Sequence, residues 1–293
     1  MIGKQLLVSN KTQQPIEPIG VPTSVSYVGK SLSPYEPSAG SHYTYDACFG
    51  YDGQSIYYKS LVSGDSTRVK QFKMATPYDI TTLSLSSAAV SGYWGTGSGN
   101  IADYFINFAA TNAIIRDNTF LRRGATGTPY APISGGTYIG GAPFGSNYHN
   151  INTVNAGEYI IMFGNSSSIN YLYKIELSTQ DDFSTWGASA KTSYDLSAYE
   201  PSGASSSIKF SGAVINQGLN LLQWDSLNSQ IKIWQNNAAF DFTSPTLVST
   251  FSIPTSDSLI VGTEAEIQIS YQGGYLFAQR QGSYNIFQFQ FGF

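Results

Sequence analysis

The chain has 293 residues, of which 41% are hydrophobic, 14% aromatic and only 12% charged. This charged share is about half that of an average soluble domain, and the aromatic content excludes intrinsic disorder. A formal net charge of −4 without a basic block excludes sequence-independent binding to nucleic acid. Cys48 is the single cysteine, so we expect no internal disulfide, no cysteine-built zinc site, and a small core residue at this position.

The N-terminal residues contain no apolar run of signal-peptide length, and no later segment approaches the ~20 apolar residues that span a bilayer. We therefore expect neither export nor membrane insertion. Residues 1–20 are expected to form an extended arm, because Pro15, Pro18 and Pro22 stand among polar residues. Residues 21–293 are assigned to one folded domain.

Strand patterns dominate that domain, and no window shows the helical period over three turns. Residues 171–177, 267–271 and 287–293 alternate apolar with polar side chains, as strands with one buried face do. Turn residues such as Tyr51-Asp52-Gly53 and Gln272-Gly273-Gly274 separate the runs. The sequence therefore predicts an all-β chain of short antiparallel strands.

A repeat organises these strands into units. Two seven-residue segments are identical except at one position, so two loops occupy equivalent places in two units. They are Leu32-Ser33-Pro34-Tyr35-Glu36-Pro37-Ser38 and Leu196-Ser197-Ala198-Tyr199-Glu200-Pro201-Ser202. The first unit starts near residue 43 and has four strands, predicted at 43–49, 55–60, 68–74 and 83–90.

Comparable units start near residues 102, 148, 207 and 266, at a spacing that suits propeller blades. The last unit reaches Phe293 after its third strand, and residues 24–33 fall in the place of the missing fourth. We therefore predict a five-bladed β-propeller closed by the N-terminal strand, which hides both sheet edges. A β-sandwich or a β-solenoid is the alternative.

The connections between the third and fourth strands share a pattern in three units. Residues 75–80, 178–183 and 237–242 each carry an aspartate beside an apolar residue, which predicts an Asx turn that bends the chain back. The second unit, through residues 116–140, is the least regular.

Motifs for nucleophilic, phosphate-binding or metal chemistry are absent from the sequence, so we expect no cofactor and no metal. His42 and His149 are expected to precede innermost strands as surface or loop residues. The glycine-rich run at 95–99 has no βαβ context, which argues against nucleotide binding.

A glycosidase is the enzymatic alternative. Asp46, Asp103 and Glu266 lie on or beside innermost strands, where carboxylates from different blades could gather as an acid and a base or nucleophile. The competing interpretation is that they are solvated residues of the axis or bind turn amides, and we prefer it.

Aromatic residues on the loops that lead into innermost strands suggest a binding face, because flat rings beside Ser, Asn and Gly suit glycan or protein contacts. A packing role between blades is the alternative for the two tyrosines of the repeated loop. Two further residues, Trp224 and Trp234, are expected in the core of the fourth blade. The candidate binding residues are Tyr35, Tyr93, Trp94, Phe144, Tyr148 and Tyr199.

The run Thr76-Pro77-Tyr78-Asp79-Ile80-Thr81-Thr82, after a glycine turn and an apolar hairpin, resembles propeller-like repeats of bacteriophage tail and fibre proteins. That resemblance implies a non-enzymatic virion structural protein that mediates assembly or host-surface attachment. A soluble, lectin-like glycan-binding propeller is the alternative.

The same resemblance implies the location and the partners. The protein would be assembled in the host cytoplasm and held in the virion by the N-terminal arm or by forming a homo-oligomer. Its partners would be other virion proteins and a host cell-surface glycan or protein.

Overall fold

The computed structural model describes most of the chain, and within some strands, including those between residues 101 and 150, it describes the backbone alone. The described residues are 20–32, 47–50, 52–60, 68–90, 101–106, 112–117, 120–125, 137–141, 148–154, 157–166, 169–188, 190–199, 210–225, 227–254, 267–280 and 285–293.

The described strands form five four-stranded antiparallel sheets, and four of them are ordered along the chain from the innermost strand outward. The first contains β2 (Ala47–Phe49), β3 (Ser55–Ser60), β4 (Arg68–Met74) and β5 (Leu83–Val90). The second contains β6 (Ile101–Ile106), β7 (Asn112–Asp117), β8 (Phe120–Ala125) and β9 (Thr137–Gly141). The third contains β10 (Tyr148–Val154), β11 (Tyr159–Ser166), β12 (Ile169–Glu176) and β13 (Ala190–Asp195).

The two remaining sheets follow the same plan, except that the last takes its outermost strand from the start of the chain. The fourth contains β14 (Ser211–Ile215), β15 (Asn220–Asp225), β16 (Gln230–Gln235) and β17 (Thr246–Ser252). The fifth contains β18 (Ile267–Gln272), β19 (Tyr275–Arg280), β20 (Asn285–Gly292) and β1 (Ser24–Leu32). Short 3₁₀ turns are η1 (Ile80–Thr82), η3 (Phe183–Ala188), η4 (Ser197–Tyr199) and η5 (Asn216–Gly218).

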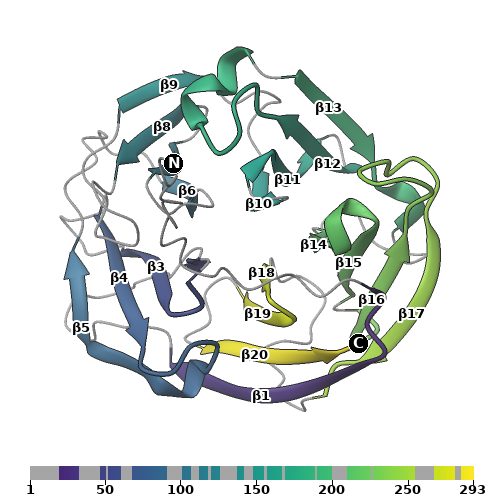
Figure 1. Ribbon diagram of the computed structural model, residues 1–293, viewed down its shortest axis with the longest axis horizontal. Coiled ribbons are helices and arrows are strands. Elements are labelled where there is room, and N and C mark those ends of the chain that lie inside the picture. Colours follow the sequence, from purple (N-terminus) through teal and green to yellow (C-terminus); the bar gives the residue numbers. More distant parts are fainter. Residues whose placement is uncertain are drawn as a thin grey trace, which may run out of the picture.

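The sheets stand in a ring around one axis (Figure 1). Strands β5, β9, β13, β17 and β1 form the rim, and the first strand of each sheet lies toward the centre. This arrangement confirms the predicted all-β propeller class, and the alternatives of a sandwich and a solenoid are wrong. Strands β3, β4 and β5 have the bounds that the sequence predicts.

The first and last described strands pair with each other. Strand β1 runs antiparallel to β20, from Ser24 opposite Gly292 to Leu32 opposite Asn285. Just before β1, the backbone N–H of Thr23 donates to the Gly292 carbonyl at 2.8 Å. The fifth sheet is thus built from both terminal parts of the described chain.

A recurring contact joins the turn after the innermost strand to the connection between the third and outermost strands. In each case a glycine with positive φ faces a non-glycine residue with positive φ, whose N–H donates to the glycine carbonyl. The pairs are Tyr78 with Gly53 (2.7 Å), Asp181 with Gly157 (2.8 Å) and Phe240 with Gly218 (2.9 Å). The second sheet's corresponding turn lies outside the described residues.

The predicted Asx turns follow these contacts directly. The carboxylate of Asp79 accepts from the backbone N–H and the hydroxyl of Thr81, at 3.0 and 2.6 Å. Asp182 does the same with Ser184, and Asp241 with Thr243. The three turns expected from the sequence are therefore confirmed.

Aromatic rings from the same connections fasten neighbouring sheets. Tyr78 stacks on Tyr275 of the fifth sheet with ring centroids 5.0 Å apart, and Phe240 lies 4.2 Å from Tyr159 of the third. Where the fourth sheet meets the segment before β1, amides replace the rings. The Gly20 N–H donates to Asn216 Oδ1 at 3.2 Å, and Asn216 Nδ2 donates to Asn220 Oδ1 at 2.8 Å.

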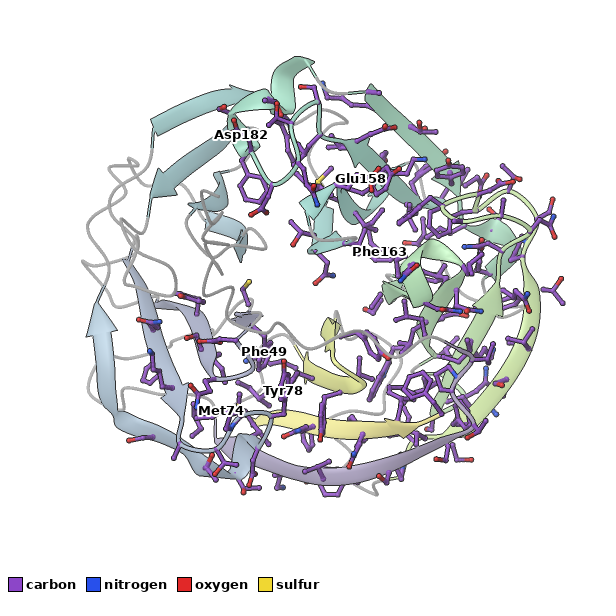
Figure 2. All side chains as sticks on the ribbon, in the orientation of Figure 1. Phe49, Met74, Tyr78, Glu158, Phe163 and Asp182 are labelled. Carbon is purple, nitrogen blue, oxygen red and sulfur yellow. The ribbon has the colours of Figure 1, made fainter. Side chains whose placement is uncertain are left out.

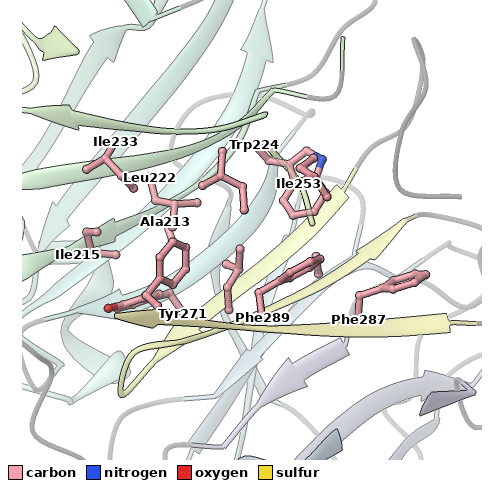
Figure 3. Packing of buried hydrophobic residues seen from close by; sticks show 13 residues of the cluster. Ala213, Ile215, Leu222, Trp224, Ile233, Ile253, Tyr271, Phe287 and Phe289 are labelled. Atoms are coloured by element: carbon pink, nitrogen blue, oxygen red, sulfur yellow. The ribbon is translucent and has the colours of Figure 1, made fainter. Parts of the chain in front are cut away.

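Hydrophobic clusters fill the spaces between sheets. Among the described residues, the largest joins the fourth and fifth sheets, with Trp224 against Phe289 (Figure 3). Phe251 of β17 also lies against Phe291 of β20. A second joins the fifth sheet to the first, where the ring centroids of Phe49 and Phe277 are 4.1 Å apart. Figure 2 labels Phe49, Met74 and Tyr78 of this cluster and its surroundings. Each fully buried large side chain contributes about 1.5–3 kcal/mol, so these clusters hold the ring together.

A buried ion pair lies in the second hairpin of the fourth sheet. Lys232 Nζ is 2.5 Å from Asp225 Oδ2, and the Asp225 side chain is only 1% exposed. Burial raises the pKa of Asp225, but hydrogen bonds from Lys232 and Asn228 outweigh it and hold the pKa below its usual value. A lowered folded-state pKa stabilises the protein above the unfolded pKa, and that contribution is lost as pH falls through the folded pKa.

Replacing Asp225→Asn is therefore expected to lower the free energy of unfolding by about 2–4 kcal/mol near neutral pH, because the Lys232 charge loses its partner. Urea titrations over a pH series would measure this, and the gap between variant and parent should narrow as the solution is acidified through the Asp225 pKa. Asp241→Asn, at an exposed carboxylate, is the matched control. An equal loss in both variants would contradict a special role for the pair.

No helix among the described residues is long and apolar enough to cross a membrane.

Candidate functional site

The innermost strands of the five sheets meet around the axis. Their Cα atoms approach within 8 Å between each pair of neighbouring sheets, from β2 and β6 round to β18 and β2. Strands β10 and β18 belong to sheets that are not neighbours, yet they also approach within 8 Å. The innermost strands therefore surround the axis closely, and Figure 1 shows them at the centre of the ring.

One level of this inner wall is polar in every sheet where the structure describes it. In four sheets, the innermost strand has a described residue that pairs with the fifth residue of the neighbouring strand (β7, β11, β15 or β19). These residues, which we call the inner polar layer, are Asp103 opposite Arg116, His149 opposite Phe163, Ser211 opposite Trp224, and Gln268 opposite Gln279. An acid, an imidazole and a hydroxyl thus occupy equivalent backbone positions on three consecutive inner strands.

Two irregularities in strand pairing adjoin the titratable members of this layer. The register shifts between Ile101 and Asp103 on β6, and between His149 and Asn152 on β10. Over their described residues, the inner pairs of the other three sheets keep a regular register. Bulges are over-represented beside active sites, where they redirect a residue.

The bulge on β10 changes which residues share a face. Residues three apart in a regular strand lie on opposite faces. Asn152, however, pairs with Ile161 and His149 with Phe163, which are two residues apart on β11. Ile161 and Phe163 belong to one core cluster, and directly opposed residues share a face. The register therefore places His149 and Asn152 on the same face of the third sheet.

Two described side chains show the environment at this wall. Ser211 is 2% exposed. Asn152 is partly exposed as a residue, but its Nδ2 is buried and has no hydrogen-bond partner among the described residues. A buried donor without a partner costs about 1–3 kcal/mol. Innermost strand β10 thus carries a buried donor that has no acceptor in the described part of the chain.

The carboxylates of the glycosidase alternative are only partly placed. Asp103 lies on innermost strand β6, as predicted. Asp46 and Glu266 lie outside the described residues, so the grouping of the three stays a prediction. His149 was expected to precede its strand, and this is wrong, because it is the second residue of β10. No three His, Cys, Asp or Glu side chains come together as metal ligands within the part of the chain that the structure describes.

The aromatic binding face is corrected at Tyr199. This side chain is fully buried. Its hydroxyl donates to the Phe242 carbonyl at 3.1 Å and to Asn236 Oδ1 at 3.3 Å. Burial is the main cause that raises the pKa of Tyr199, and the negative charge of Asp241 adds to it. Its packing role between the third and fourth sheets is confirmed. Tyr148 is the first residue of β10 rather than a loop residue. Four other candidates lie outside the described residues, namely Tyr35, Tyr93, Trp94 and Phe144.

The remaining expectations about single residues are met in part. Trp224 is buried in the core between the fourth and fifth sheets, as predicted, while Trp234 is only partly buried. Cys48 on β2 is also partly buried. Sequence reasoning missed Ser211, Gln268 and Asn152. The bulge on β10 breaks the regular period of two before Asn152, and single Ser and Gln residues in a strand carry no motif that marks them as site residues.

The ring of sheets around a polar axis defines the chain as a β-propeller. No family model matches the chain, and no curated protein matches it. Among solved structures, similarity is found to a Bacteroides fragilis protein provisionally named a 6-phosphogluconolactonase, with 12% identity and a TM-score of 0.43. A functionally unknown protein of Desulfotomaculum acetoxidans is 11% identical in sequence with a TM-score of 0.40. A periplasmic gluconolactonase of Pseudomonas aeruginosa is 9% identical with a TM-score of 0.41.

These matches cover 80% of this chain and 62–64% of the others, so the chain spans just under two thirds of their length. Two of the three names are those of lactonases, which are hydrolases, and none is that of a virion protein. The expectation of a non-enzymatic phage component is contradicted by these names and is withdrawn. At 9–12% identity and these TM-scores, the similarity assigns no activity, so function has to be derived from this chain's own residues.

Proposed function

We propose that the chain is a five-bladed propeller hydrolase whose acid–base pair is Asp103 and His149. The observation that carries the proposal is their equivalent register position on adjacent inner strands β6 and β10, each beside a bulge. The five four-stranded sheets support the blade count.

This pair of residue types has the chemistry that hydrolysis requires. Imidazole titrates near neutral pH and can take a proton from water and return it to a leaving group. A neighbouring carboxylate fixes its tautomer and stabilises the imidazolium that forms. Ser211 is only 2% exposed, which favours water over the serine hydroxyl as the nucleophile.

The closeness of the innermost strands bears on the size of the substrate. The innermost strands approach one another within 8 Å even between two non-neighbouring sheets, which favours a small substrate over a polymer. The proposal is therefore hydrolysis of small molecules that reach the polar layer from one end of the axis.

The test is turnover of small chromogenic esters, sugar lactones and p-nitrophenyl glycosides by the full chain and its variants. His149→Gln and Asp103→Asn are expected to lower kcat/KM by about 10²–10⁴-fold, the usual contribution of a general acid–base group. The pH profile of His149→Gln should also lose the limb that reports an imidazole base.

Matched controls come from the same chain. His42→Gln changes the other histidine, and Asp117→Asn changes a carboxylate on β7 of the same sheet as Asp103. Ser211→Ala should keep activity within a few-fold if water is the nucleophile. Absence of turnover on all three substrate classes, or parent-like activity in both His149→Gln and Asp103→Asn, would refute the proposal.

A further inference from the structure

We infer that Asn152 donates its amide N–H to an oxyanion, so that the substrate is an acyl compound, a carboxylic ester or lactone. The inference rests on the proposed function, because it places Asn152 beside the acid–base pair. It goes further by choosing between the bond types that such a pair could hydrolyse.

The first support is the unpartnered donor itself. Among the described residues, the buried N–H donors without a hydrogen-bond partner are Asn152 Nδ2 and the indole Nε1 groups of Trp186 and Trp224. Trp186 lies in η3 and Trp224 on the second strand of its sheet, both within hydrophobic clusters. Asn152 alone of these three is on an innermost strand, the strand of its sheet that lies nearest to the axis.

The second support is the register. The bulge places Asn152 on the face of the third sheet that His149 occupies, opposite residues of β11 that are two positions apart. Two residues of a strand span about 7 Å. A substrate carbonyl group fits between two residues at that separation. His149 would act on its carbon through a water molecule, and the Asn152 N–H would lie about 2.7–3.1 Å from its oxygen.

The reaction balances without any other reagent. His149 takes a proton from water as the water oxygen bonds to the carbonyl carbon, and the carbonyl π electrons move to oxygen. The Asn152 N–H donates to this oxyanion. The carbonyl then re-forms, the bond from carbon to the leaving oxygen breaks, and the imidazolium returns its proton to that oxygen. Ester and water become acid and alcohol, and a lactone becomes a hydroxy acid.

A glycoside would make different use of the site. Its transition state is an oxocarbenium ion, which carries positive charge and is stabilised by carboxylates. A neutral amide N–H is attracted to developing negative charge and gives such an ion no stabilisation. The unpartnered donor therefore favours acyl over glycosyl transfer.

The experiment pairs kinetics with stability in Asn152→Leu, which has a similar size but no donor. We expect kcat on the best ester or lactone to fall about 10²–10³-fold with little change in KM. We also expect the melting temperature to stay equal to or above that of the parent, because the change removes a buried donor that has no partner.

Asn170→Leu is the matched control. Asn170 is 4% exposed, and its Oδ1 accepts from the backbone N–H of Phe210 at 3.2 Å. Losing that acceptor should lower the melting temperature, and kcat should stay near the parent value. The two asparagines are thus expected to behave in opposite ways.

The outcomes separate the two proposals. Parent-like kcat in Asn152→Leu, or a loss of stability like that of Asn170→Leu, would overturn the role of Asn152. Turnover of glycosides but not of esters or lactones, dependent on Asp103 and His149, would overturn the inference while the proposed function stands. Ester turnover that survives Asp103→Asn and His149→Gln would overturn the proposed function, and the inference with it.

Discussion

A chain that begins at residue 33 is expected not to reach the native fold. The deletion removes β1, whose residues from Ser24 to Leu32 form the outer edge of the fifth sheet against β20. It also removes Tyr27, whose ring centroid lies 5.7 Å from that of Phe289, and leaves the outer edge of β20 without a partner strand. Size-exclusion chromatography and thermal unfolding should show an expanded or aggregated chain without a cooperative transition.

Adding the missing strand back is the control. A synthetic peptide of residues 20–32 is expected to restore a cooperative transition to the shortened chain, and a scrambled peptide of the same composition is not. Deletion of residues 1–19, assigned to an arm from the sequence, should leave the transition in place. An unchanged melting midpoint in the chain that begins at residue 33 would show that β1 is dispensable.

Gly218→Ala is expected to destabilise the protein by about 2–5 kcal/mol, a large effect for one methyl group. Gly218 has a φ of +88°, which side chains other than glycine rarely adopt. A Cβ at this position would also lie 2.6 Å from the ring of Phe240, whose N–H is bonded to the Gly218 carbonyl. Urea unfolding would measure the loss.

Two further variants separate the causes. Gly292→Ala adds a methyl group where φ is ordinary and the atom nearest to it is the Ser24 hydroxyl, which can rotate away, so its effect should be much smaller. Phe240→Ala combined with Gly218→Ala relieves the clash but not the φ strain. Strict additivity of the two single changes would show that the ring contact is unimportant.

Much of the fold follows from local patterns in the sequence. Strands β3, β4 and β5 match their predicted bounds because alternating apolar residues lie between clear turn signals. The Asx turns at Asp79, Asp182 and Asp241 were predictable since the aspartate and the hydroxyl residue it binds are two positions apart. Such features depend on neighbours along the chain, which the sequence displays directly.

The candidate site follows no local pattern. Asp103, His149 and Ser211 hold equivalent register positions on three separate hairpins, and bulges on β6 and β10 break the period of two that would align them along the chain. The local sequence around Tyr199 is equally undecided, because an aromatic residue in a polar loop suits both an exposed binding face and a buried core. Its burial depends on Phe242 and Asn236, which are distant in sequence.

The pairing of β1 with β20 has a consequence for synthesis of the protein. Thr23 and Gly292, which are hydrogen-bonded, are 269 residues apart. At about 5–20 residues per second, β1 waits roughly 13–54 s for its partner to be translated. The other four sheets can assemble on the ribosome during that time, but the fifth cannot. Ring closure therefore acts as a check on completeness, because a nascent chain that stops before β20 leaves an unpaired strand that chaperones and proteases can recognise.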